Sequence, residues 1–121
     1  MIVAGFGFRT GASLGSLRAA LMLAQEGLPP VTHLATAHEK TAGLLPLAEA
    51  LRLAITGVDA DAMATTPTAT RSAASNMARG TGSVAEAAAL AAAGPGARLL
   101  RSRQISSDRM ATCAIAQGSN P

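Results

Sequence analysis

Cysteine and aromatic side chains are almost absent from this chain of 121 residues. Cys113 is the single cysteine, so the sequence allows neither an internal disulfide nor a zinc site built on paired cysteines. Tryptophan and tyrosine are missing, and Phe6 and Phe8 are the only phenylalanines. Single-stranded nucleic acids are usually bound by stacking their bases on aromatic rings. The composition therefore suits a reducing compartment and argues against nucleic acid as a partner.

Charged residues are also scarce, at 14%, whereas hydrophobic residues make up 49% of the chain. This balance excludes a disordered chain. No hydrophobic run approaches the length of a membrane span, and the amino terminus has neither the basic region nor the cleavage site of a signal peptide. We therefore expect a cytoplasmic protein with no membrane partner.

The charges that are present are unevenly distributed. Ten basic residues stand against seven acidic ones, which gives a net charge of +3. Arg98, Arg101, Arg103 and Arg109 fall in one short stretch in which Asp108 is the only acidic residue. An excess of this kind favours an anionic partner but does not identify it.

Hydrophobic periodicity predicts strands alternating with helices in the first half of the chain. The expected elements are a strand at 2–8, a helix at 13–26, a strand at 31–36, a helix at 44–51 and a strand at 53–58. This alternation is typical of a mainly parallel sheet with helices on its faces.

The second half of the chain begins with a segment of weak periodicity, from 59 to 82, where we expect short helices, one of them near 71–79. Ser83 and Glu86 have the spacing of a capping box at the start of a further helix. Two strands at 97–103 and 109–116 follow, and the short polar turn between them requires antiparallel pairing.

Together these patterns predict a single compact α/β domain over residues 1–116. Its mixed sheet has about five strands, mostly parallel with a C-terminal antiparallel pair, and helices flank both faces. Strict alternation would place Arg101 and Arg103 on one face of their strand and Arg98 on the other. Residues 117–121 are expected to form a frayed tail.

The segment from Gly5 to Gly11 is the most informative part of the sequence. It lies where the first strand turns into the first helix, and ligands of open α/β sheets bind beyond the carboxyl ends of strands. Backbone amides there favour negative charge, and Arg9 adds a planar fork suited to carboxylate or phosphate. A tight turn remains an alternative. A dinucleotide fingerprint fits poorly, because the third glycine comes one residue late.

A second candidate segment follows the next predicted strand. Lys40, the only lysine, can pair with an anionic ligand group or be an ordinary surface charge. His38 and Glu39 have the chemistry of an acid-base pair, but adjacent residues seldom point the same way. His33 is expected to be a hydrogen-bonded histidine of the strand. Two histidines without a clustered carboxylate argue against a metal site, and we expect no cofactor.

These motifs resemble a known family. The opening Gly5-x-Gly7-x-Arg9-x-Gly11, Thr36 followed by Lys40, the helix start at 82–90, and Leu99-Leu100 before a basic strand end resemble the CobE proteins of aerobic cobalamin biosynthesis. CobE is similar to the carboxyl-terminal domain of CbiG, a cobalt-precorrin hydrolase of the anaerobic route. The resemblance covers residues 2–116.

The resemblance implies a protein that binds or carries an acidic corrin or precorrin intermediate between pathway enzymes, which would be its further partners. The ligand-binding residues that we predict are Gly5, Gly7, Phe8, Arg9, Thr10, Gly11, Ser13, Thr36, His38, Lys40 and Arg103. Ser13 is equally suited to capping the first helix. Arg103 falls where relatives carry a lysine, which keeps the charge but changes the hydrogen-bond geometry.

Catalysis is not assigned to any residue by the sequence. The leading interpretation is a carrier without enzymatic activity. The alternative is a hydrolase acting on a precorrin lactone or ring-contraction intermediate through Lys40, His38 or Glu39. The loop after Lys40 is shorter than in the hydrolase relatives and lacks their acidic residue. A third hypothesis is a regulatory protein whose basic face meets an acidic enzyme surface.

Overall fold

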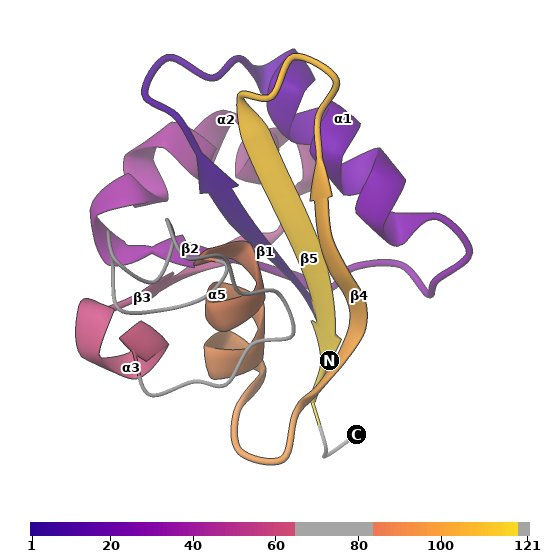
Figure 1. Ribbon diagram of the computed structural model, residues 1–121, viewed down its shortest axis with the longest axis vertical. Helices are drawn as coiled ribbons and strands as arrows, with labels where there is room; N and C mark the ends of the chain where they lie inside the picture. Colours follow the sequence, from indigo (N-terminus) through magenta and orange to yellow (C-terminus); the bar gives the residue numbers. More distant parts are fainter. Residues whose placement is uncertain (65–83, 119–121) are drawn as a thin grey trace.

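The protein is an α/β domain built on a sheet of five strands (Figure 1). The computed structural model describes residues 1–64 and 84–118. In chain order the elements are β1 (Ile2–Phe8), α1 (Leu14–Gln25), β2 (His33–Ala37), the 3-10 helix η1 (His38–Lys40), α2 (Thr41–Leu51), β3 (Ala54–Val58), α3 (Ala60–Ala64), α5 (Val84–Ala93), β4 (Arg98–Ile105) and β5 (Ala111–Gln117). The predicted helix near 71–79 and the Ser83 half of the capping box lie outside the described residues.

The strands are ordered β3-β2-β1-β5-β4. β1, β2 and β3 pair in parallel, whereas β5 is antiparallel to both β1 and β4. The predicted mixed sheet is therefore confirmed. Because β5 starts beside the end of β1, the β4–β5 turn lies at the same edge as the carboxyl ends of β1, β2 and β3. We call this the loop edge; in Figure 1 the arrowhead of β1 and the β4–β5 turn lie toward the top of the picture.

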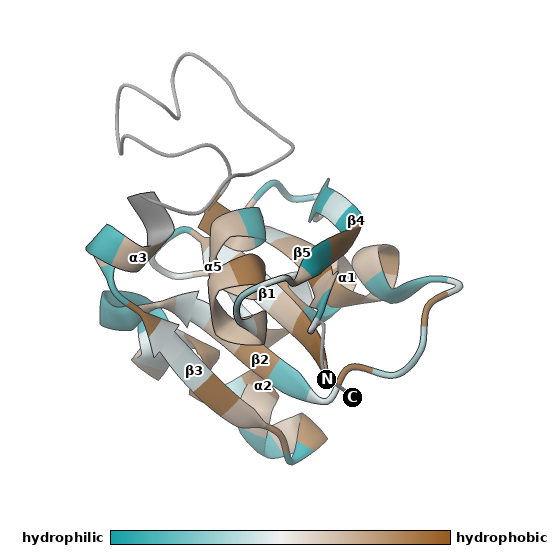
Figure 2. Cartoon of the chain, turned by 90° about the horizontal axis from the view of Figure 1, so that it is seen from below, coloured by the Kyte–Doolittle hydropathy of each residue, from teal (hydrophilic) through white to brown (hydrophobic). Residues whose placement is uncertain are grey.

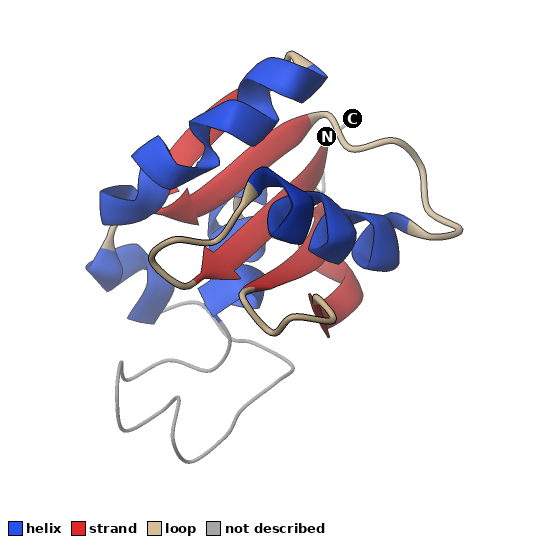
Figure 3. Ribbon diagram, turned by 90° about the horizontal axis from the view of Figure 1, so that it is seen from above, coloured by secondary structure: helices blue, strands red, loops and turns tan. Residues whose placement is uncertain are grey.

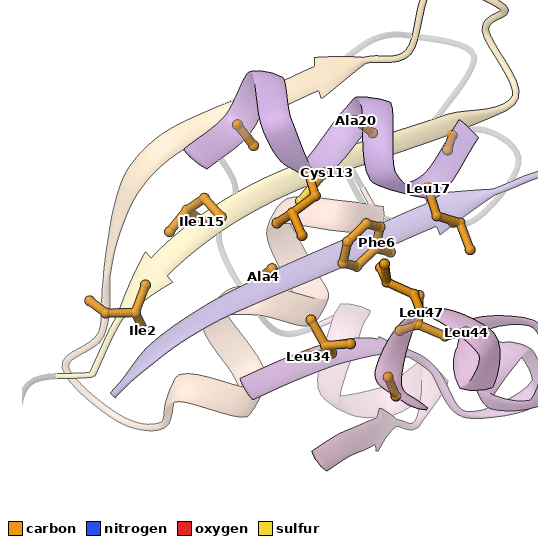
Figure 4. Packing of buried hydrophobic residues seen from close by; sticks show 14 residues of the cluster. Ile2, Ala4, Phe6, Leu17, Ala20, Leu34, Leu44, Leu47, Cys113 and Ile115 are labelled. Carbon is orange, nitrogen blue, oxygen red and sulfur yellow. The ribbon is translucent and has the colours of Figure 1, made fainter. Parts of the chain in front are cut away.

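Helices cover both faces of this sheet, as the alternating pattern predicted (Figure 3). α1 and α2 pack on one face around Phe6, Leu17, Leu44 and Ile115, all of which are fully buried (Figure 4). Burying a side chain of this size stabilises the fold by about 1.5–3 kcal/mol. This face therefore holds the larger hydrophobic cluster.

The other face is covered by α5, whose alanines lie directly on β1. Ala85, Ala87, Ala88 and Ala89 have no exposed surface. A Cβ atom on Gly5 would lie 2.1 Å from the carbonyl oxygen of Ala85. Only a glycine in the strand lets the helix backbone come this close. In Figure 2 hydrophobic colour runs along β1 and β2, and hydrophilic colour is found on β4.

The C-terminal strand extends further than we predicted. Gln117 pairs with Ile2 of β1 and with Arg98 of β4, and the Gly118 amide donates to the Met1 carbonyl over 3.0 Å. Strands on both sides satisfy the backbone of residue 117, so fraying does not begin there. Residues 119–121 of the expected tail lie outside the described part.

The strict alternation expected for β4 is interrupted. Its pairing with β5 shifts register between Leu99 and Arg101 and again between Arg101 and Gln104. Bulges of this kind turn successive side chains away from a simple two-sided pattern. Arg101 donates to the carbonyl oxygens of Ala24, at 3.2 Å, and of Glu26. Its guanidinium thus closes the carboxyl end of α1.

Cys113 lies in β5 and is fully buried among hydrophobic side chains. Burial raises the pKa of its thiol well above the usual value. A thiol in this position is inert, because reactive cysteines need an accessible and electropositive environment. Among the described helices, none is both long and apolar enough to cross a membrane.

Candidate functional site

The loop between β1 and α1 is held by its backbone, while its side chains face solvent. The Arg9 amide donates to the carbonyl of Met110 over 2.9 Å, and the Ala12 amide donates to that of Arg9 over 3.0 Å. Gly11 completes the bend with a φ of +89°, a conformation that glycine adopts without strain. Arg9, Thr10 and Gly11 are exposed. This part of the predicted site is open to a ligand.

Gly5 and Gly7 do not belong to this loop. Both are residues of β1 beneath α5, where a Cβ on Gly7 would lie 3.0 Å from Thr112 Oγ1 and 3.5 Å from Val84 Cβ. Their small size is explained by packing within the protein, because α5 approaches Gly5 and the Thr112 side chain of β5 approaches Gly7. We therefore leave them out of the proposed ligand contacts.

Lys40, the last residue of η1, contacts the same loop. Its Nζ lies 5.5 Å from the centroid of the Phe8 ring and 3.4 Å from Thr10 Oγ1. An ammonium group at this distance over a ring is attracted by the ring's negative face. Phe8 in turn lies against Gly43 in the first turn of α2. The structure thus brings Phe8, Thr10 and Lys40 together at the loop edge.

The other predicted residues of the second segment are placed differently. Thr36 has no exposed surface, and its hydroxyl donates to the Phe6 carbonyl over 2.9 Å. This side chain links β2 to β1 from inside, so we leave it out of the ligand contacts too. His38 is exposed and lies close to Gly57 of β3. His33 is at the far edge, where its Nδ1 lies 2.8 Å from Thr32 Oγ1, as expected for a hydrogen-bonded histidine.

Ser13 serves as the N-cap of α1. Its side-chain oxygen accepts from the Ser16 amide over 3.1 Å, which satisfies one of the free amides at the helix start. Of the two roles that the sequence left open for Ser13, capping is therefore the one seen. A ligand contact by the same hydroxyl remains a prediction.

The β4–β5 turn is fastened to this helix start by Asp108, which sequence reasoning passed over. Ser16 and Ser106 donate their hydroxyls to the two oxygens of its carboxylate, the latter over 2.6 Å. The Met110 amide donates to the same carboxylate over 3.0 Å. The Ser106 and Ser16 hydroxyl bonds, named in order of their effect, lower the pKa of Asp108 below its usual value. We call these three residues, Ser16, Ser106 and Asp108, the Asp108 clasp.

Of the four arginines in the basic stretch, Arg109 is the one that the clasp brings to the loop edge. It follows Asp108 and precedes Met110, whose carbonyl receives the Arg9 amide. Arg103 lies instead in the outer strand β4, where its amide donates to Glu86 over 2.9 Å. No described contact connects Arg103 with Arg9 or Lys40. The basic cluster in the sequence is therefore divided in space.

Helix ends add to the positive character of the loop edge. α1 begins directly after its N-cap Ser13, α2 begins directly after Lys40, and Val84 at the start of α5 lies beside Gly7. The amino end of a helix carries partial positive charge from its free amides. Within the described ranges no group of three or more His, Cys, Asp or Glu side chains is placed to hold a metal. The arrangement is suited to binding anions.

Comparison with known proteins identifies the family. Residues 2–116 match the family described as Cobalamin synthesis G C-terminus. This chain belongs to that family. The resemblance to CobE and to the carboxyl-terminal part of CbiG is thereby confirmed, and the chain is a protein of cobalamin biosynthesis.

Solved structures of family members superpose closely on it. One is CobE, a protein from the cobalamin (vitamin B12) biosynthetic pathway, with 32% identity and a TM-score of 0.83 over 96% of this chain and 89% of that one. Another is the cobalamin biosynthesis protein chiG from Agrobacterium tumefaciens str. C58, with 37% identity and a TM-score of 0.76 over 99% of this chain and 100% of that one.

A more distant structure shows the same fold inside a longer chain. It is a cobalamin biosynthesis protein G homolog from Sulfolobus solfataricus, with 19% identity and a TM-score of 0.76 over 98% of this chain and 37% of that one. No match is found among curated proteins.

Proposed function

We propose that this protein binds an acidic corrin-ring precursor of cobalamin at the loop edge and carries it between pathway enzymes. The observation that supports this most is the exposed loop at Arg9 and Thr10, which Lys40 joins with its Nζ 3.4 Å from Thr10 Oγ1. Arg9 makes no side-chain hydrogen bond or ion pair within the described residues. A corrin precursor is edged with acetate and propionate carboxylates, for which a free guanidinium provides a planar pair of donors.

The apolar part of such a ligand also has a counterpart at this edge. Phe8 is only half-buried, and its ring lies beneath Lys40. Leu14 and Ile105 are among the exposed large hydrophobic side chains, at 37% and 39%, and they stand at the start of α1 and the end of β4. An apolar macrocycle with an anionic rim fits an edge that carries both apolar and cationic side chains.

The position of η1 favours a carrier over the alternative hydrolase. Within this short helix Lys40 reaches toward Phe8 of β1, while His38 lies against Gly57 of β3. β1 and β3 are separated by β2. Because nucleophile, base and acid must come within hydrogen-bond distance of one reacting centre, this divergence supports binding as the main role of Lys40.

Titration of the purified protein with hydrogenobyrinic acid, followed by corrin absorbance, tests the proposal. We expect saturable binding at micromolar concentration, recovery of unchanged ligand, and no binding of the fully methyl-esterified corrin. Absence of binding by the acid contradicts the proposal. Conversion of many precorrin molecules per protein would instead establish the hydrolase.

A further inference from the structure

Arg109 adopts a backbone conformation that arginine rarely takes. Its φ is +61°, in the left-handed region, where a Cβ atom crowds the backbone at a cost of about 1–2 kcal/mol. Glycine or asparagine usually occupies this position in a hairpin loop. A non-glycine residue in this conformation motivates the hypothesis that its side chain has a use, which the surrounding contacts must then support.

The Asp108 clasp holds this conformation in place. The Arg109 amide donates to the Ser106 carbonyl over 2.8 Å, which closes the turn. The next amide, that of Met110, is held by the Asp108 carboxylate, whose other oxygen is held by Ser16 of α1. The backbone on each side of Arg109 is thus fixed relative to the helix that follows the Arg9 loop.

The guanidinium of Arg109, by contrast, is not engaged. Arg109 is exposed, and its side chain makes no hydrogen bond or ion pair with the described residues. The Arg9 amide donates to Met110, the neighbour of Arg109. Two free arginines are therefore carried by adjacent backbone segments that lie 100 residues apart in sequence.

We propose that Arg109 is a second carboxylate-binding residue of the loop edge, and that the Asp108 clasp positions it next to Arg9. This inference rests on the proposed function and makes it more specific. The ligand is a polycarboxylate in which one carboxylate meets Arg9 and another meets Arg109. A ligand with a single carboxylate engages one of the two and binds more weakly.

Arg109→Gly separates a binding role from a structural one. The substitution removes the guanidinium and also relieves the strained φ, so we expect Tm to stay unchanged or to rise by up to about 5 °C. We expect the Kd for hydrogenobyrinic acid to increase by about tenfold to a hundredfold, as for the loss of one charge-assisted contact. Arg109→Lys keeps the charge without the planar fork and should lose less affinity.

The chain offers a matched control in Arg52. It is the other non-glycine residue with positive φ among those described, at 58°, and it forms the C-cap of α2 at the end away from the loop edge. Arg52→Gly removes the same charge and relieves the same kind of strain. We expect the same change in Tm as for Arg109→Gly, with a Kd within twofold of the wild type.

These measurements distinguish failure of the Arg109 inference from failure of the proposed function. If the wild type does not bind hydrogenobyrinic acid, the proposed function fails and this inference fails with it. If the wild type binds and Arg109→Gly binds equally well, only the role of Arg109 is wrong. A fall in Tm of more than about 5 °C together with lost binding would show that Arg109 acts on the fold, which also overturns the inference.

Discussion

The two halves of the segment from Gly5 to Gly11 lie in very different surroundings. Gly5 and Gly7 are in β1 under α5; a Cβ on Gly5 would overlap the helix backbone, and one on Gly7 would lie 3.0 Å from Thr112 Oγ1 of β5. Arg9, Thr10 and Gly11 are exposed in the loop that follows. Seven consecutive residues thus change from packing a helix to facing solvent at the point where the strand ends.

The difference shows why a glycine-rich motif can mislead. Glycine permits close approach of any backbone, whether it belongs to a ligand or to the protein itself. At Gly5 the approaching group is the backbone of α5, and at Gly11 nothing lies within 4 Å of the missing side chain. The first half therefore supports the fold on which the second half is displayed. The experiments below are designed to separate these two roles.

Gly5→Ala should have the largest effect, and the effect should be on stability. The added methyl would overlap the Ala85 carbonyl and the Ala89 amide, so α5 must move away from β1. We expect a loss of about 3 kcal/mol in the free energy of unfolding, measured by urea denaturation.

Gly15→Ala is the matched control for that change. Gly15 lies in α1, and its nearest neighbour is Ser13 Oγ at 3.6 Å, an ordinary contact. Alanine there should raise stability by about 0.5 kcal/mol. If both variants changed the free energy of unfolding equally, the distinction between the packed glycine and the open glycine would be wrong.

Arg9→Ala should have an intermediate effect, confined to binding. The substitution leaves the amide that donates to Met110 in place, so Tm should change by less than about 2 °C. The Kd for hydrogenobyrinic acid should increase by about tenfold, and the dependence on salt should weaken because one ionic contact is lost.

Arg98→Ala provides the comparison for charge. Arg98 is exposed at the start of β4, away from the loop edge, and its loss changes the net charge by the same amount. Its affinity should match that of the wild type. Unfolding of the Arg9 variant, or equal loss of binding in both, would mean that the second half of the segment is not the binding half.

The smallest expected effect is on stability, when the Asp108 clasp is protonated at low pH. The pKa of Asp108 is lowered from its usual value of 3.8, so the ionised carboxylate stabilises the fold above that value. This contribution is lost as pH falls from about 4 through the lowered pKa. The Tm difference between the wild type and Asp108→Asn should therefore shrink below about pH 4.

Glu49→Gln, a change at an exposed residue of α2, should show no comparable convergence in the same scan. If the difference between the wild type and Asp108→Asn is instead constant from pH 7 to about pH 2.5, the carboxylate does not fasten the turn to α1. The turn that carries Arg109 would then be held by other contacts.

Much of the fold could be predicted from local pattern, and less of the site. The strand at 2–8 and the antiparallel pair at the end were recognised because apolar spacing and turn residues act within a few positions. The position of Lys40 at the same edge as Arg9 could be predicted, because parallel strands end on the same side of a sheet. The burial of Thr36 was missed, because the sequence around a threonine at the end of a strand does not show whether its side chain faces the core or the solvent.

By itself, the sequence determined the family, the alternation of strands and helices, and the cationic character of the loop after β1. Only the tertiary structure decided which glycines lie under α5, and that Asp108 reaches Ser16 across 92 residues. It also decided that the turn carrying Arg109 lies against the backbone of Arg9, through the hydrogen bond from the Arg9 amide to the Met110 carbonyl. The physical reason is that periodicity records neighbours along one element, whereas the pairing of β5 with β1 joins the two ends of the chain.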